Sequence, residues 1–195
     1  SPIGDEGLLQ LTAKLPGGLE RLLLQDSGIS DLAPLVALPW LGELKLLALG
    51  EQVLSPGSGM LLSSIRGGPI ELQLERAGID AEGARALLAS TSSRRLNLRE
   101  NEWSEGALQG LEKIADSLNT VDLSETGLGV QDLKILSLLP EPASLEELHL
   151  EGLASVGDAG LDAISAIPWL SRLSKLKVRG TGAGSEARAR LREAW

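Results

Sequence analysis

The sequence predicts an α/β solenoid, an open horseshoe arc of about seven strand–helix repeats with a parallel sheet on the concave face and helices on the convex face. Three observations predict this fold class. A short leucine pattern recurs seven times in the 195 residues, a helix-opening pattern follows most copies, and very few side-chain types are available to fill the core. Units of one strand and one helix bury their apolar faces by stacking on one another, which produces an elongated array.

The first observation is the strand pattern LxxLxL. It occurs at residues 19–29, 41–49, 69–79, 93–103, 118–128, 145–153 and 173–183, with another residue in place of one leucine in four of the seven copies. Aligned on the middle apolar position, the units place Leu22, Leu44, Leu72, Leu96, Val121, Leu148 and Leu176 at equivalent points. Successive middle residues are thus 22 to 28 positions apart, the length of a strand, a helix and two turns. Seven strands are expected, with their leucines facing the helices.

The second observation is the segment that follows each strand. Helix-like segments occur at 3–11, 79–88, 103–111, 129–136, 156–164 and 184–191, and an acidic residue or Ser opens them. Side-chain acceptors cap free amides at a helix N-terminus, and carboxylates suit its positive dipole end. The unit that begins at residue 41 departs from the pattern, because its segment 53–65 contains Pro and two Gly. We expect that helix to be short or displaced.

The third observation is the composition of the core. The chain has no Phe, Tyr or Cys and one Met, so its four Trp residues are the only large aromatic side chains. Leucine and alanine must supply the core, which suits a stack of thin, similar layers. The lack of cysteine excludes disulfides, thiolate nucleophiles and cysteine-ligated zinc. It fits a reducing compartment, and we expect a cytoplasmic protein.

The charge and hydropathy of the chain limit its partners. A net charge of −9 disfavours nucleic acid, whose phosphates require a basic face. No apolar run reaches the roughly 18 to 20 residues of a membrane span, and the opening SPIGDEG lacks the features of a signal peptide. We therefore expect neither a nucleic acid nor a membrane partner. Because the chain begins with Ser instead of Met, a targeting signal missing from this sequence is left open.

The repeats extend over nearly the whole chain, so we expect one domain, 1–195. Within it, 1–18 would be an N-terminal helix that serves as a cap or a partial repeat, 19–183 the repeats, and 184–195 a C-terminal capping helix. The first helix lacks its own strand, so the chain either begins in mid-repeat or is cut from a longer protein. The tail carries Arg188, Arg190 and Arg192. Its basic end could bind an acidic partner, although capping is the simpler interpretation.

These residues resemble the leucine-rich repeat family, in particular its ribonuclease-inhibitor-like class, in which each repeat joins a strand to a full helix. The resemblance rests on the LxxLxL units and on helix starts such as IGDEG. The family usually has Asn, Cys, Thr or Ser three residues after the last strand leucine. In this sequence those positions hold Ser27, Asn101, Thr126 and Thr181 in four units, but Leu49, Ala77 and Leu153 in the others. We expect the hydrogen-bonded ladder beneath the strands to be incomplete.

The alternation of a strand places the residues between the core leucines on the concave face. The candidate partner-binding residues there are Arg21, Leu23, Lys45, Leu47, Glu71, Glu75, Arg95, Asn97, Arg99, Asp122, Glu147, His149, Glu151, Lys175, Lys177 and Arg179. Their charges are sorted by repeat: the third is acidic, the fourth basic, the fifth and sixth acidic, and the seventh basic. These bands either match charges on a protein partner or merely pair across neighbouring strands. Leu23 and Leu47 form an apolar spot that either anchors a partner or is covered by further repeats.

The single histidine invites a catalytic interpretation. His149 is expected between Glu147 and Glu151, with Asp122 on the neighbouring strand, and these carboxylates favour the imidazolium. The alternatives are a solvated, ion-paired surface side chain, a metal ligand and a general acid or base. Glu147 and Glu151 are four strand residues apart, about 13 Å, which is too far for a catalytic dyad. We expect no metal, no cofactor and, without a phosphate-binding loop, no small-molecule substrate.

The sequence therefore favours a non-catalytic module that binds a protein on its concave face. The resemblance implies partners as varied as nucleases, small GTPases and ubiquitin-pathway components, and it selects none of them. One alternative is a structural or regulatory repeat segment of a larger multidomain protein. A further alternative is a hydrolase-type enzyme centred on His149 and Asp122.

Overall fold

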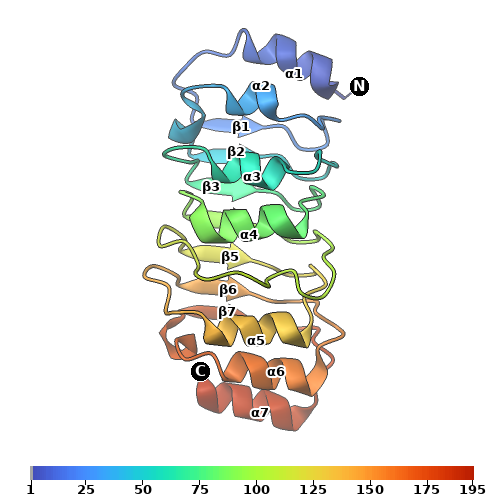
Figure 1. The fold of residues 1–195 in the computed structure, drawn as a ribbon, viewed down its shortest axis with the longest axis vertical. Helices are drawn as coiled ribbons and strands as arrows, with labels where there is room; N and C mark the ends of the chain where they lie inside the picture. The colour runs from blue at the N-terminus through green and yellow to red at the C-terminus, as the bar shows by residue number, and fades with distance from the viewer. Residues whose placement is uncertain (1) are drawn as a thin grey trace.

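The protein, described by a computed structural model for residues 2–195, is built on one seven-stranded, entirely parallel sheet (Figure 1). Its strands are β1 (Arg21–Leu23), β2 (Leu46–Ala48), β3 (Glu71–Gln73), β4 (Arg95–Asn97), β5 (Thr120–Asp122), β6 (Glu147–His149) and β7 (Lys175–Lys177). They pair in chain order, from β1 at one edge to β7 at the other, and the sheet does not close. The predicted α/β class with successive strand–helix units is confirmed.

The helices form a second layer in front of the sheet, in the same order as the strands (Figure 1). They are α1 (Gly4–Thr12), α2 (Ala33–Val36), α3 (Ser58–Ser63), α4 (Ala81–Ser90), α5 (Val130–Leu138), α6 (Gly157–Ser165) and α7 (Ser185–Ala194), with 3₁₀ turns η1 (Leu41–Glu43) and η2 (Leu170–Arg172). The predicted helices at 3–11, 79–88, 129–136, 156–164 and 184–191 are confirmed, and α3 is short as expected. Among residues 2–195, no helix is long and apolar enough to cross a membrane.

The core lies between the two layers. Residues of β1, β3, β4 and β5 alternate in burial, as period-2 geometry requires, whereas all three residues of β2 are buried. The middle residues Leu72, Leu96, Val121 and Leu148 are each 1% exposed. The alternate residues lie on the other side of the sheet, which none of the helices named above covers and which we call the open face. Leucine and alanine provide most of the core, so the prediction that these two residue types fill it is confirmed.

The predicted register of the second repeat is wrong by three residues. Leu22 pairs with Leu47, and Leu47 pairs with Leu72, so the middle core residue is Leu47 and not Leu44. The segment LGELKLLAL contains two overlapping frames, and only the later one keeps 25 residues between both pairs of neighbours. Leu44 is buried as well, next to η1, which is why its apolar character suggested the earlier frame.

The helix predicted at 103–111 is not formed. Residues 105–110 make turns, in which Gly106 and Gly110 have φ of 90° and 81°. An α-helix requires φ near −63°, so two residues at positive φ end any helix here. Asp132 of α5, fully buried, accepts hydrogen bonds from the amides of Gly106 at 3.3 Å and Leu108 at 3.0 Å. A neighbouring repeat thus supplies acceptors for these turn amides, and irregular backbone occupies the place between α4 and α5.

Buried side-chain amides join successive repeats beneath the strands. Asn101 donates to the carbonyls of Leu74 at 2.7 Å and Leu98 at 2.9 Å, and its oxygen accepts from the amides of Ala77 and Ile79. These bonds tie the fourth repeat to the third.

Gln52 has the same role in the second repeat, near the N-terminal edge of the sheet. It donates to the carbonyls of Leu24 and Leu49 and accepts from the amide of Ile29. The ladder position of the second repeat is therefore Gln52, and the assignment of Leu49 is wrong because it followed the wrong register. The hydroxyl of Thr126 reaches only the carbonyl of Leu123 in its own repeat. The ladder is incomplete, as expected.

The substitution Asn101→Ala tests this ladder. It would leave two buried amides and two buried carbonyls without their partner, and an unsatisfied buried group costs about 1 to 3 kcal/mol. We expect the free energy of unfolding, measured by urea denaturation, to fall by about 3 kcal/mol. The exposed neighbour Glu102 is a matched control, and Glu102→Ala should change stability by less than about 0.5 kcal/mol. Equal effects of the two substitutions would contradict a structural role for the amide.

Candidate functional site

The open face presents three rows of side chains that run across the strands. They come from the first residue of each strand, from its third residue, and from the position two residues after the strand. Because all strands pair in parallel and in register, equivalent residues lie side by side. The predicted residues found on this face, or directly after its strands, are Arg21, Leu23, Glu71, Glu75, Arg95, Asn97, Arg99, Asp122, Glu147, His149, Glu151, Lys175, Lys177 and Arg179. Residues up to 158 positions apart in sequence, Arg21 and Arg179, are therefore brought onto one surface.

Two predicted residues do not belong to this surface. Leu47 is completely buried in the core, and Lys45 precedes β2, where its Nζ lies 2.6 Å from Glu20 Oε1. Both errors come from the shifted register of the second repeat. The nearly constant spacing of 25 residues was the signal in the sequence that could have found the correct frame.

The corrected register places an apolar strip at the N-terminal end of the open face. It consists of Leu23, which is 53% exposed, and of its neighbours Leu46 and Ala48 on β2, which are buried at 9% and 0% exposure. Gly50 follows them, and a Cβ atom there would lie 2.5 Å from the carbonyl oxygen of Glu75. The second repeat therefore forms a low, uncharged floor beside the protruding side chain of Leu23. Sequence reasoning found Leu23 and missed the other members of the apolar strip.

The charged bands pair with one another across the strands. Arg95 lies 3.5 Å from Glu71, Lys175 lies 3.0 Å from Glu147, and Lys177 lies 3.8 Å from Glu151. These side chains are partly exposed, and such pairs contribute little to stability, typically about 0 to 1 kcal/mol. The geometry supports cross-strand pairing, although the same side chains remain accessible to a partner.

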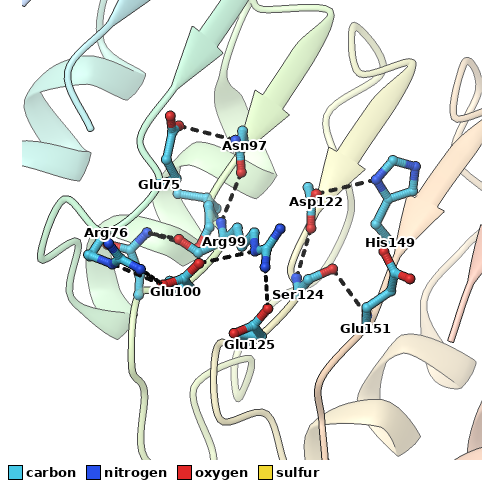
Figure 2. Close-up of polar contacts among 12 residues, drawn as sticks. Glu75, Arg76, Asn97, Arg99, Glu100, Asp122, Ser124, Glu125, His149 and Glu151 are labelled. Carbon is cyan, nitrogen blue, oxygen red and sulfur yellow. Dashed lines mark hydrogen bonds and ion pairs between the residues drawn. The ribbon is translucent and has the colours of Figure 1, made fainter. Parts of the chain in front are cut away.

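In addition to the charged bands, a row of charged side chains follows the strand ends. Asp26, Glu51, Arg76, Glu100 and Glu125 occupy equivalent turn positions, each with φ between 49° and 57°. Figure 2 shows Arg76 directed to Glu100, and Arg99 directed to Glu100 and Glu125. Arg76 also lies 2.9 Å from Glu51. Sequence reasoning missed this row because these residues lie outside the strand alternation.

His149 is buried, and the expectation of a solvated side chain is wrong. It is only 7% exposed; its Nδ1 lies 3.3 Å from Asp122, and its Nε2 lies 3.3 Å from Glu147. An imidazole can donate from both nitrogens only when it carries both protons. The ring is thus placed to form ion pairs with two carboxylates, as Figure 2 shows for Asp122.

Ser124 follows β5, and its hydroxyl hydrogen-bonds to the backbone of the next repeat. Its Oγ accepts the backbone amide of Glu151 at 3.0 Å, its own amide donates to Asp122 at 2.9 Å, and the residue is 2% exposed. Both nitrogens of His149 face carboxylates, so neither is free to take a proton from this hydroxyl. Over residues 2–195, there is no group of three or more His, Cys, Asp or Glu side chains arranged to hold a metal ion.

Glu147 connects the histidine to the C-terminal strand. The hydrogen bond from Lys175 is the main cause that lowers the pKa of this carboxyl, and His149 acts in the same direction, while burial opposes them. A lowered pKa means that the ionised carboxylate is favoured in the folded protein. Its contribution to stability is present above the ordinary pKa of a Glu side chain and is lost as the pH falls through the lowered value.

The substitution Lys175→Met tests this coupling because it removes the main cause of the pKa shift. The unfolding free energy of the wild type should fall more steeply than that of the variant between about pH 6 and about pH 3. Urea denaturation at several pH values measures both slopes. Lys134→Met on α5, an exposed lysine, is the control and should keep the slope of the wild type. Parallel curves for wild type and Lys175→Met would contradict the assignment.

The fold and this surface define a class: an α/β repeat protein whose parallel sheet has one helix-covered face and one open face. Compared with known protein families and with individual curated proteins, the sequence matches no family model and no protein.

Proposed function

We propose that the chain is a leucine-rich-repeat solenoid of the ribonuclease-inhibitor-like class, and that it serves as a non-catalytic module that binds a protein partner on its open face. The class is supported by seven strand units of the LxxLxL type, four of them with one leucine replaced, which pair in chain order with helices on one side. The buried amides of Asn101 and Gln52 beneath the strands also support it. In this class the open face is the concave one. Seven strands about 4.8 Å apart make an arc of about 30 Å, enough to hold one folded partner.

The apolar strip carries this proposal. Leu23 exposes 53% of its surface, and the neighbouring strand carries the apolar, buried Leu46 and Ala48 beside it. A partner that covers Leu23 would remove this apolar surface from water, which favours association. The rest of the open face is polar and charged, which suits the rim of an interface. We therefore place the centre of binding over β1 and β2.

The charged bands contribute orientation in this proposal. Arg95 and Lys175 are paired with carboxylates of the preceding strands, so their side chains are held in place before a partner arrives. Complementary charges raise the association rate and fix the register of docking more than they raise affinity. The partner is expected to present alternating acidic and basic groups along the axis of the arc.

The hydrolase hypothesis centred on His149 and Asp122 has weaker support. His149 is buried between two carboxylates, and the hydroxyl of Ser124 hydrogen-bonds to the backbone of Glu151. A general base needs a free nitrogen within hydrogen-bond reach of the group that it deprotonates. This arrangement favours an ion-paired side chain that helps to shape the open face.

The substitution Leu23→Asp tests the apolar strip as the anchor. Immobilised wild type would capture the partner from a native lysate, mass spectrometry would identify it, and calorimetry would measure its affinity for each variant. Leu23→Asp should weaken binding at least about tenfold, which corresponds to about 1.4 kcal/mol. Leu138→Asp is the matched control, because Leu138 is 82% exposed on α5 in the helical layer. Equal affinities for the wild type and Leu23→Asp would overturn the proposal.

A charge exchange distinguishes a role in recognition from simple cross-strand pairing. Arg95→Glu alone should weaken binding of the identified partner about fivefold to tenfold, because it reverses the charge of the basic band. Adding Glu71→Arg restores the pair between β3 and β4 with its direction reversed. If the partner recognises the charged bands, the double variant still binds it weakly, although the unfolding free energy of this variant returns to that of the wild type. Full recovery of binding in the double variant would show that only internal pairing matters.

A further inference from the structure

Within residues 2–195, the C-terminal edge of the sheet carries a row of backbone hydrogen-bonding groups that no strand pairs with. Lys175 donates to the carbonyl of Glu146 at 3.2 Å, and the carbonyls of Lys177 and Arg179 accept from amides that lie just after β6, both at 2.8 Å. Alternate residues of a strand bond to opposite neighbours. The amides and carbonyls of Leu176 and Val178 therefore point away from β6, and within residues 2–195 no strand pairs with that side of β7.

An apolar groove accompanies this free edge. It has a volume of about 360 Å³ and is lined by Leu176 and Val178 of the edge strand and by Leu191 and Trp195 at the end of α7. Leu176 and Val178 are only half-buried, unlike the equivalent core residues of the inner strands, and Trp195 is 48% exposed. We call this region the C-terminal edge groove. An apolar surface next to unpaired strand backbone is a template for another strand.

The charge around the C-terminal edge groove is opposite to that of the whole chain. Residues 172–195 contain seven Lys and Arg and two Glu, a net charge of +5 in a chain of −9. Arg179, Arg188 and Arg192 line the groove. No carboxylate of residues 2–195 lies within salt-bridge distance of these three side chains. By contrast, Arg190 on the same helix pairs with Asp162 at 2.8 Å.

We propose that the C-terminal edge groove binds an acidic, extended polypeptide segment, which adds to β7 as an eighth strand. The main chain of the segment would bond to Leu176 and Val178, in the manner of known strand additions. Its alternate side chains would lie on opposite sides of the sheet. Apolar ones would enter the groove, and carboxylates would face Lys175, Lys177 and Arg179 on the open face. The ligand is thus defined as a segment in which apolar and acidic residues alternate.

This surface is separate from the apolar strip and does not depend on it. The apolar strip lies on β1 and β2 at the opposite end of the sheet, and its proposed partner is a folded protein. The proposed ligand of the C-terminal edge groove is an extended acidic segment, because that is the form that can add to the edge of a sheet as a strand.

The test uses synthetic peptides and the intact protein. The probe is a fluorescein-labelled nine-residue peptide in which Glu and Val alternate, and fluorescence polarisation at low salt measures its binding. Two control peptides accompany it, one with Lys in place of Glu and one with N-methyl groups on alternate amides. The acidic peptide should bind, and added salt should weaken it. The N-methylated peptide should bind at least tenfold more weakly, and the Lys peptide should not bind.

Protein variants locate the site. Lys177→Glu combined with Arg179→Glu should weaken binding of the acidic peptide at least tenfold, because the carboxylates of the peptide would face these two side chains. Arg190→Glu on α7 is the control and should leave binding within twofold, because Arg190 faces Asp162 of α6. Hydrogen exchange should show new protection of the amides of Leu176 and Val178 in the complex.

Several results would overturn the proposal. Failure of the acidic peptide to bind at millimolar concentration would exclude this ligand class. Equal binding of the N-methylated peptide would exclude strand addition, and equal loss in Arg190→Glu would reduce the effect to general charge attraction. Sedimentation equilibrium measures whether the protein self-associates. If the wild type self-associates and the Lys177→Glu, Arg179→Glu variant does not, the occupant of the groove is a second copy of this chain and not an acidic segment.

Discussion

The parallel register of seven very short strands is the constraint on which the rest of the structure depends. Each strand has only three residues, so its backbone bonds are few and come almost wholly from the strands beside it. Each repeat must therefore place its strand in register with the neighbouring strands. The residues between the strands must pack against the same face of the sheet. The buried amides of Asn101 and Gln52 reinforce this requirement by bonding to the backbone of the preceding repeat.

The same register distributes the surface chemistry. Equivalent residues lie beside one another, so a change of charge from one repeat to the next becomes a cross-strand ion pair, as between Arg95 and Glu71. Pairing neutralises the middle of the open face locally. The two ends differ from the middle, because the N-terminal end carries the apolar strip and the C-terminal edge groove carries arginines that no carboxylate of residues 2–195 pairs with. Interior strands have partners on both sides, and edge strands do not.

The departures from the expected pattern occur where neighbouring repeats decide the local structure. In the second repeat, two leucine frames are compatible with the local sequence, and pairing with Leu22 and Leu72 selects Leu47. In the fourth repeat, a helix-like segment forms turns, because Gly106 adopts positive φ and the buried carboxylate of Asp132 accepts the turn amides. Neither result follows from local periodicity, since both depend on contacts across about 25 residues of sequence.

The sequence by itself determined the number of strands, the class of the sheet and most residues of the open face, including Leu23, Arg95 and His149. It could do so because a strand alternates with period 2 and because seven copies of one pattern fit only one stacked arrangement. Only the tertiary structure decided that His149 is buried between Asp122 and Glu147, that Leu47 belongs to the core, and that no strand of residues 2–195 pairs with the outer side of β7. These properties depend on which repeat lies next to which, and on whether a given strand lies inside the array or at its edge.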